Sequence, residues 1–192
     1  MSYLIIGSSS FILFLLHDLN ANIIRSRIVA SFFAVGSAVL VISSGLMAFT
    51  DPVVSISTLG RILGSFFSLV FLFLLFHTLF LALPFRRTYI QQPRKGALVD
   101  RGVYALCRHP GVLWLFFLYL SLGFAFGSLL LFLAAVVYTL LNIGYILLQE
   151  SLWFPERFKG YAEYKKRTPF LIPNPTSIRA CIRTIRHERM TL

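Results

Sequence analysis

VLWLFFLYLSLGFAFGSLLLFLAAVVYTLLNIGYILL, residues 112–148, contains no charged side chain from end to end. A helix crosses the hydrocarbon core of a bilayer in about 20 residues, so this stretch is too long for one crossing and suits two. Gly123 and Gly127 lie near its middle. Because lipid offers no hydrogen bonds to an open loop, we expect two spanning helices that fold back as a tight hairpin, with the turn between these glycines.

Three further apolar blocks precede the hairpin, at residues 3–16, 28–49 and 62–83. The second and third are each long enough to span, whereas three consecutive serines make the first marginal. No positively charged segment precedes the first block, so a removable signal peptide is the weaker interpretation. We therefore expect an all-α, polytopic integral membrane protein with about five transmembrane helices, including the C-terminal hairpin, plus interfacial helices on the cytoplasmic side.

The composition agrees with this class, because 57% of the residues are hydrophobic, only 13% are charged, and 20 are Phe. We expect one integral membrane domain over residues 1–192. Its parts would be three spanning helices in residues 1–84, a half with the candidate site in residues 85–175, and a basic tail in residues 176–192.

Basic residues are divided unevenly between the two ends of these helices. In chain order, the connections between the apolar blocks carry two, one and six basic residues, and the segment after residue 148 carries nine. Alternate connections share a side, so 17 of the 18 basic residues fall together, which the positive-inside rule assigns to the cytoplasm. The N-terminus is then outside and the C-terminus cytoplasmic. Short loops favour a bacterial inner membrane.

The net charge of +11 arises from residues that flank membrane segments and not from a soluble basic face, so nucleic acid is not the expected partner. Anionic lipid headgroups are expected instead. In the tail, two residue types recur at helical spacing: Ile178, Ile182 and Ile185, and Arg179, Arg183 and Arg186. The pattern fits an amphipathic helix lying on the membrane, and the composition fits a disordered basic end equally well.

Cys107 and Cys181 are the only cysteines. Both fall on the side assigned to the cytoplasm, where thiols stay reduced, and they lack the spacing of zinc ligands. We expect neither a disulfide nor a metal.

Polar residues stand at both ends of the hairpin. Arg108 and His109 come just before it, and Glu150 directly follows its apolar run. A hairpin brings its ends together, so we expect this carboxylate and the Arg-His pair to form a site for a zwitterion, or for a cofactor that carries both charges. The alternative for Arg108 and His109 is a juxtamembrane anchor, since basic residues commonly flank spanning helices.

The order of residues around the hairpin resembles the isoprenylcysteine carboxyl methyltransferase superfamily, which also contains phospholipid N-methyltransferases and is related to the membrane sterol reductases. The match covers roughly the second half of the chain. Before the hairpin, the family pattern falls on Leu98, Val99, Gly102, Tyr104, Arg108, His109 and Pro110. After it, the pattern falls on Gln149, Glu150, Phe158, Gly160, Tyr161, Tyr164, Arg167 and Pro169.

This resemblance implies S-adenosylmethionine as the cofactor at the cytoplasmic face and a lipid or lipophilic acceptor, prenylated or phospholipid, that arrives from the bilayer. Most of the rate would come from aligning nucleophile and sulfonium in a site closed to water. It implies cofactor contacts from Leu98, Val99, Gly102, Tyr104, His109, Pro110, Glu150, Tyr161 and Tyr164. It also implies that Glu150 pairs with an ammonium and that Arg108 and Arg167 bind anionic groups.

The sequence departs from the family in two places. Residues 111–114 lack the tyrosine that usually follows Arg-His-Pro, and Gln149 replaces one acid of a glutamate pair. Two other functions therefore remain open. One is an NADPH-dependent reductase related to the sterol reductases, because residues 172–175 also resemble the C-terminal ends of those enzymes. The other is a non-catalytic lipid-binding membrane protein.

His77 is an ionisable residue at membrane depth in the third block, seven residues before Pro84. Such a residue is a functional candidate, here as the proton acceptor for an incoming nucleophile. The favoured alternative is a neutral histidine that is hydrogen-bonded between helices.

Overall fold

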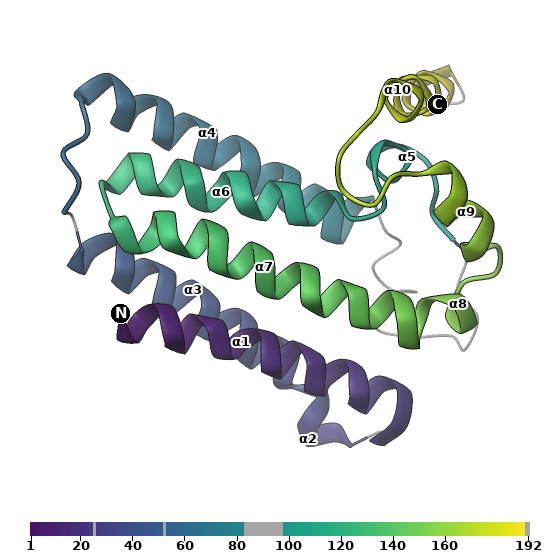
Figure 1. The fold of residues 1–192 in the computed structure, drawn as a ribbon, viewed down its shortest axis with the longest axis horizontal. Helices are drawn as coiled ribbons and strands as arrows, with labels where there is room; N and C mark the ends of the chain where they lie inside the picture. Colours follow the sequence, from purple (N-terminus) through teal and green to yellow (C-terminus); the bar gives the residue numbers. More distant parts are fainter. Residues whose placement is uncertain (25, 52, 83–97, 191–192) are drawn as a thin grey trace. The chain divides into compact units, whose positions relative to one another are not determined.

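The computed structural model describes residues 1–24, 26–51, 53–82 and 98–190, whose helices are drawn in Figure 1. Within these residues the regular secondary structure is helical throughout, with no β-strand. Four helical segments are long and apolar enough to cross a membrane: Ser2–Ile24, Ile28–Thr50, Thr58–Leu81 and Leu129–Leu152. Pro110–Phe126 is a shorter apolar helix. The all-α class is confirmed, the helices are compatible with a multi-pass membrane protein, and the number of crossings stays a prediction.

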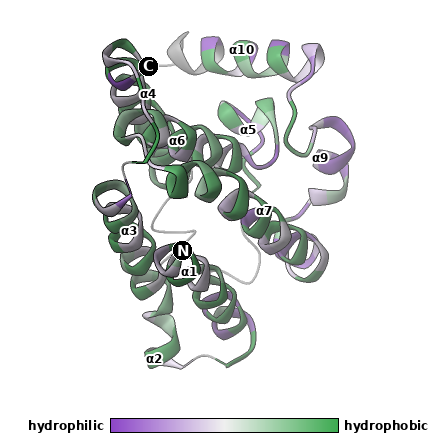
Figure 2. Cartoon of the chain, turned by 60° about the vertical axis from the view of Figure 1, so that its left-hand side comes forward, coloured by the Kyte–Doolittle hydropathy of each residue, from purple (hydrophilic) through white to green (hydrophobic). Residues whose placement is uncertain are grey.

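Hydrophobic residues cover the long helices α1 (Ser2–Leu19), α3 (Phe32–Thr50), α4 (Thr58–Phe76), α6 (Pro110–Phe126) and α7 (Leu129–Leu152), as Figure 2 shows. Much of this surface is exposed, with Ile5, Phe49 and Leu69 each about 70% accessible. Large exposed apolar surfaces mark interaction sites in soluble proteins. On helices long enough to span a bilayer, such surfaces are what contact with lipid requires.

The chain divides into two compact units. Unit 1 contains Met1–Leu72 and Leu115–Leu147, and unit 2 contains Phe73–Trp114 and Leu148–Leu192. Unit 1 holds most of the long helices, and unit 2 holds every residue of the candidate site. Residues 83–97, which carry four of the basic residues of the third connection, lie outside the described residues.

In unit 1, α1 packs along α3 through small residues (Figure 1). Gly7 of α1 faces Tyr138 of α7 and Ser43 of α3, and a Cβ added there would lie 2.6 Å from the Ser43 hydroxyl. Gly36 of α3 lies against the ring of Phe14, which a Cβ would meet at 2.9 Å. Close approach at small residues is how membrane helices gain packing energy without a hydrophobic driving force.

The first helix is longer than its apolar block, because α1 continues as a π-helix over Asn20–Ile24. The polar residues at its end have partners outside the helix. Tyr145 donates to the Asp18 carboxylate at 2.5 Å, and a ring nitrogen of His17 lies 3.1 Å from the carbonyl oxygen of Ala30. Asn20 donates to the Ser26 carbonyl and accepts from the Ser26 amide, which fixes the turn into α2 (Arg27–Ala30).

The hairpin predicted from residues 112–148 is present as α6 and α7, with its turn at Gly127 and Ser128. Gly127 has φ 69°, a left-handed conformation that glycine adopts without a steric penalty. The Asp51 carboxylate caps α7 by accepting from the Leu130 amide at 2.9 Å. Gly123 lies within α6 instead of the turn, where a Cβ would come 2.7 Å from the ring of Phe132. Its role is close packing of the two helices.

Unit 2 contains the π-helix η2 (His77–Leu81) and the short helices α5 (Val103–Leu106), α8 (Phe154–Arg157) and α9 (Tyr161–Arg167), followed by α10 (Pro175–Met190). Asn174 caps α10 by accepting from the Ser177 amide at 2.8 Å, and Ser177 accepts from the Asn174 amide in return. The described part of the tail, up to Met190, is therefore a helix and not a disordered end. It packs on α5, and Thr184 accepts a hydrogen bond from the Gly102 amide at 3.0 Å.

Candidate functional site

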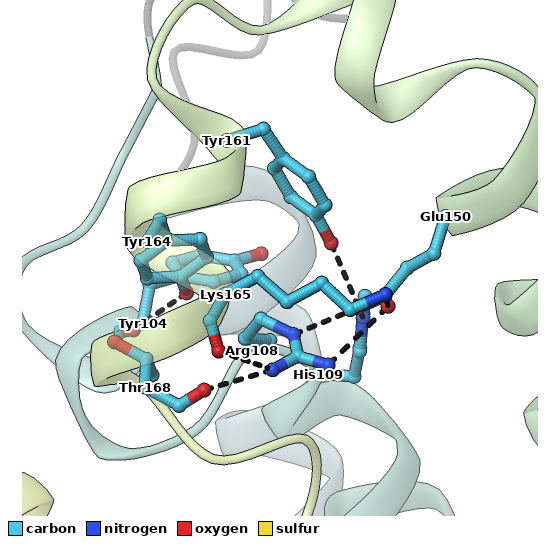
Figure 3. A network of polar contacts seen from close by, with 8 residues as sticks. All are labelled: Tyr104, Arg108, His109, Glu150, Tyr161, Tyr164, Lys165 and Thr168. Atoms are coloured by element: carbon cyan, nitrogen blue, oxygen red, sulfur yellow. Dashed lines mark hydrogen bonds and ion pairs between the residues drawn. The ribbon is translucent and has the colours of Figure 1, made fainter.

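Glu150, near the end of α7, is the centre of a buried polar cluster (Figure 3). Its side chain is 3% exposed. Oε1 accepts from Arg108 Nε at 2.8 Å, His109 Nε2 at 2.7 Å and the Tyr161 hydroxyl at 2.7 Å. Oε2 lies 3.3 Å from Arg108 Nη2 and 3.2 Å from Lys165 Nζ. A carboxylate withdrawn from water needs this density of donors, because its hydration must be replaced.

Arg108 is held from several directions, which fixes its orientation toward Glu150. Its Nη1 donates to the carbonyl oxygens of Thr168 at 2.9 Å and Lys165 at 3.2 Å. Its guanidinium also lies over the ring of Phe170, 5.4 Å from the centroid. The guanidinium fork thus joins the hairpin end to the segment that follows α9.

The main chain repeats this connection. The Arg108 amide donates to the Pro169 carbonyl at 2.9 Å, and the His109 amide donates to the Phe170 carbonyl at 3.3 Å. These bonds satisfy amides just before α6, which begins at the buried Pro110. Proline suits a helix start because its missing N–H would have no intrahelical partner there.

His109 lies between two aromatic rings, with centroids 5.1 Å from Phe170 and 6.2 Å from Phe154. Burial lowers the pKa of His109 below its usual value, against the hydrogen bond and charge of Glu150, which raise it. The imidazole is therefore neutral at pH 7. Since a carboxylate only accepts, Nε2 carries the proton and Nδ1 is left as the acceptor.

Three tyrosines extend the cluster. Burial raises the pKa of Tyr161, as does its bond to Glu150, and burial also raises the pKa of Tyr164. Both hydroxyls therefore stay protonated, and that of Tyr164 donates to the Tyr104 carbonyl at 2.7 Å. The Tyr104 hydroxyl donates to the Thr78 carbonyl in η2 at 3.1 Å, while Trp114 donates to the Thr78 hydroxyl at 3.0 Å.

The structure brings six of the twelve predicted site residues together. Arg108, His109, Glu150 and Tyr161 share direct hydrogen bonds, and Tyr104 and Tyr164 are bonded to each other beside them. Other predicted residues lie outside this cluster: Leu98 and Val99 are half-buried, Gly102 contacts α10, and Arg167 is 62% exposed and pairs with Asp100.

His77 begins η2, and its ring lies 6.2 Å from that of Phe73. Its Nδ1 is buried and has no hydrogen-bond partner among the residues described. Both the hydrogen bond between helices and the role of His77 as a proton acceptor stay predictions.

Sequence analysis missed Lys165 and Thr168. Within the basic run at residues 165–167 the family pattern singles out only Arg167, yet Lys165 reaches Glu150, whereas Lys166 pairs with the exposed Glu163 at 2.8 Å. Helical spacing offered a signal, because Lys165 stands four residues after Tyr161 and so shares its face of α9.

Cys107 and Cys181 are both buried and carry free thiols. Burial raises the pKa of Cys107 to about 11 and also raises that of Cys181. The described residues contain no group of three His, Cys, Asp or Glu side chains placed to hold a metal ion.

Comparison with protein-family models, curated proteins and solved structures finds no match for this chain. The geometry of the cluster is therefore the basis for its chemistry. A buried carboxylate, a guanidinium and a neutral histidine, whose Nδ1 is an acceptor, provide complementary groups for a polar ligand that carries both charges.

Proposed function

We propose that this protein is an S-adenosylmethionine-dependent integral membrane methyltransferase that acts on a lipid or lipophilic acceptor. One observation carries the proposal. Four residues assigned to the site by family resemblance, from segments on both sides of the hairpin, meet in one hydrogen-bonded cluster: Arg108, His109, Glu150 and Tyr161. Two more, Tyr104 and Tyr164, are hydrogen-bonded to each other beside it. A simple juxtamembrane anchor has no use for a buried network of this kind.

The chemistry of the side chains suits the amino-acid moiety of this cofactor. In this scheme, Oε2 of Glu150 binds the cofactor's ammonium. The two contacts of Oε2, at 3.2 and 3.3 Å, are longer than those of Oε1. The bound cofactor would supply an electrophilic methyl group. Arg108 is a positioning residue in this scheme, because its bonds to Glu150, Lys165 and Thr168 hold the carboxylate in place.

The remaining residues would order the site and exclude water. Tyr161 donates to the carboxylate and aromatic rings pack against His109, and alignment in such a dry site can supply most of the rate of a direct displacement. His109 Nδ1 offers a neutral acceptor for a hydrogen-bond donor of the cofactor or the acceptor.

We further propose five membrane crossings, with α6 as the fourth, the N-terminus outside and the site at the cytoplasmic face of a bacterial inner membrane. The distribution of basic residues supports this orientation. At 17 residues α6 is short for a crossing, so it would need a local thinning of the bilayer or flanking side chains that reach to the interface.

α10 is proposed to lie on the cytoplasmic surface, in contact with anionic headgroups. Its faces support this placement: Ser177 and Cys181 are buried, whereas Ile178, Ile182 and Ile185 form an exposed stripe at helical spacing. The exposed Arg179, Arg183 and Arg186 flank that stripe. Apolar residues beside arginines are what an interfacial helix presents to an anionic membrane.

Calorimetric titration of the full-length protein in lipid nanodiscs with S-adenosylhomocysteine, in parallel with NADPH, tests the proposed function. The variant Glu150→Gln keeps the size of the side chain and removes its charge, and Glu163→Gln makes the same change at an exposed carboxylate outside the cluster. Saturable binding of S-adenosylhomocysteine that only Glu150→Gln weakens is the expected result. Binding of NADPH alone would favour the reductase, and binding of neither would favour a non-catalytic lipid-binding protein.

The acceptor is sought by incubating the same nanodiscs with labelled S-adenosylmethionine and a bacterial lipid extract. Transfer of label into a chromatographically separable lipid, abolished in Glu150→Gln and kept in Glu163→Gln, is expected.

A further inference from the structure

The partners of Glu150 differ in how readily they can leave. Arg108, His109 and Tyr161 are enclosed, with at most 10% of each of the two basic side chains exposed. The Lys165 side chain is 54% exposed although its Nζ lies 3.2 Å from Oε2. Lys165 is thus the partner of the carboxylate that water already reaches.

Exposure changes the cost of breaking each interaction. If Arg108 moved away, a buried carboxylate and a buried guanidinium would both be left without compensation, which is strongly unfavourable. If Lys165 moved away, its ammonium would be hydrated at once, and Glu150 would keep three enclosed donors. A half-exposed ion pair contributes little to stability, so this one can open readily.

The backbone of Lys165 does not need to follow its side chain. Its carbonyl oxygen accepts from Arg108 Nη1 at 3.2 Å, and Thr168, three residues later, accepts from the same nitrogen at 2.9 Å. The end of α9 is therefore anchored to Arg108 while the four-carbon side chain can rotate outward. Opening of this ion pair needs only a change of rotamer.

The charge of the cluster indicates what can replace Lys165. With His109 neutral, Glu150 and Arg108 compensate one another, and the Lys165 ammonium adds one positive charge at Oε2. Another primary ammonium at this position would restore the same charge and the same hydrogen bond. A neutral donor would restore the hydrogen bond but not the charge, and an anionic group would restore neither.

We infer that the Lys165 ammonium occupies the position on Glu150 Oε2 that the ammonium of the ligand takes, so that Lys165 competes with the ligand inside the free protein. This inference rests on the proposed function and concerns the same site. Lys165 then acts as a specificity residue, because only a ligand that brings its own ammonium can re-form the ion pair with Glu150 after the lysine is displaced.

Affinities of S-adenosylhomocysteine and methylthioadenosine for wild-type, Lys165→Met and Lys166→Met proteins in nanodiscs test this inference. Methylthioadenosine has the adenosine and the thioether but neither the ammonium nor the carboxylate. Lys166 is the matched control, since it is the next lysine on α9 and pairs with Glu163 outside the cluster.

Removal of an internal competitor as weak as an exposed ion pair raises apparent affinity by about two- to fivefold. We expect Lys165→Met to bind S-adenosylhomocysteine more tightly than the wild type by this factor. We expect it to bind methylthioadenosine with the wild-type affinity. Lys166→Met should have the wild-type affinity for both ligands. Lys165→Gln, which keeps a polar side chain, should reproduce the effect.

Unchanged or weaker binding of S-adenosylhomocysteine to both Lys165 variants would overturn the inference and leave the proposed function standing. Equal tightening of both ligands would also overturn it, because the increase in affinity would then not depend on the ammonium. No binding of S-adenosylhomocysteine to any variant would overturn the proposed function, and this inference with it.

Discussion

Arg108 and Glu150, 42 positions apart in the chain, form a two-pronged ion pair with nitrogen–oxygen distances of 2.8 and 3.3 Å. Both side chains are almost fully buried. Replacement of Arg108 by Gln should lower the free energy of unfolding by about 3–5 kcal/mol, because it leaves a buried carboxylate without its main counter-ion. Denaturation by sodium dodecyl sulfate, followed by circular dichroism, measures the loss.

Arg108→Lys keeps the charge but lacks the planar fork, so we expect an intermediate loss of stability. Arg167→Gln is the control, because Arg167 pairs with Asp100 at 2.7 Å on the exposed side of α9 and should change stability by less than about 1 kcal/mol. Equal effects at positions 108 and 167 would contradict the importance of the buried pair.

Stability should fall as the solution becomes acidic, through His109. The pKa of His109 is lowered in the folded protein by burial, so the unfolded chain binds the proton more tightly. The contribution of neutral His109 to stability is fully present above the pKa of about 6.5 that histidine has in the unfolded chain. It is lost as the pH falls through the lower pKa of His109 in the folded protein. Thermal unfolding midpoints between about pH 8 and pH 5 measure this slope.

His109→Gln should flatten that part of the pH profile, since the titrating group is gone. A slope that persists in His109→Gln would assign the acid sensitivity to another group.

Gly7 and Gly45 should respond in opposite directions to alanine. A Cβ on Gly7 would collide with Tyr138 and Ser43, so Gly7→Ala should destabilise the protein by about 1–3 kcal/mol. Gly45 of α3 has nothing within 4 Å of its would-be Cβ, so Gly45→Ala should stabilise by about 0.5–1 kcal/mol through helix propensity. Thermal unfolding of the two variants in parallel checks the sign of each effect.

The placement of α10 is tested by tryptophans at neighbouring positions. In nanodiscs with brominated anionic phospholipids, Ile182→Trp should be quenched because it lies on the exposed apolar stripe, whereas Arg183→Trp should not. The fluorescence of the native Trp114 and Trp153 is subtracted using the wild-type protein. Equal quenching at positions 182 and 183, or none at either, would contradict an interfacial α10.

The helices could be predicted largely because the length of an apolar run has a direct physical meaning in a bilayer. The hairpin followed from the absence of charge over residues 112–148, and its turn from a glycine, since Gly127 adopts φ 69°. The extent of α1 could not be predicted in this way. Its polar end is helical because Asp18 and Asn20 find partners in Tyr145 and Ser26, and no local pattern identifies a partner 127 residues away.

The site was predictable where the order of motifs constrains geometry. Arg108 and Glu150 stand at the two ends of one hairpin, so their contact follows once the hairpin is recognised. Lys165 was not separated from Lys166, because both are basic, adjacent and on a polar helix. Only the rotation of α9 about its axis distinguishes them, and that rotation is set by the packing of Tyr161 and Tyr164.

The burial of Cys107 and Cys181 has a practical consequence. Because both thiols are buried and their pKa values are raised, we expect them to be poor nucleophiles that react slowly with maleimides and peroxides. Single cysteines introduced at exposed positions can therefore carry spin labels or fluorophores in the otherwise native chain, and the protein can be handled in air without a reductant.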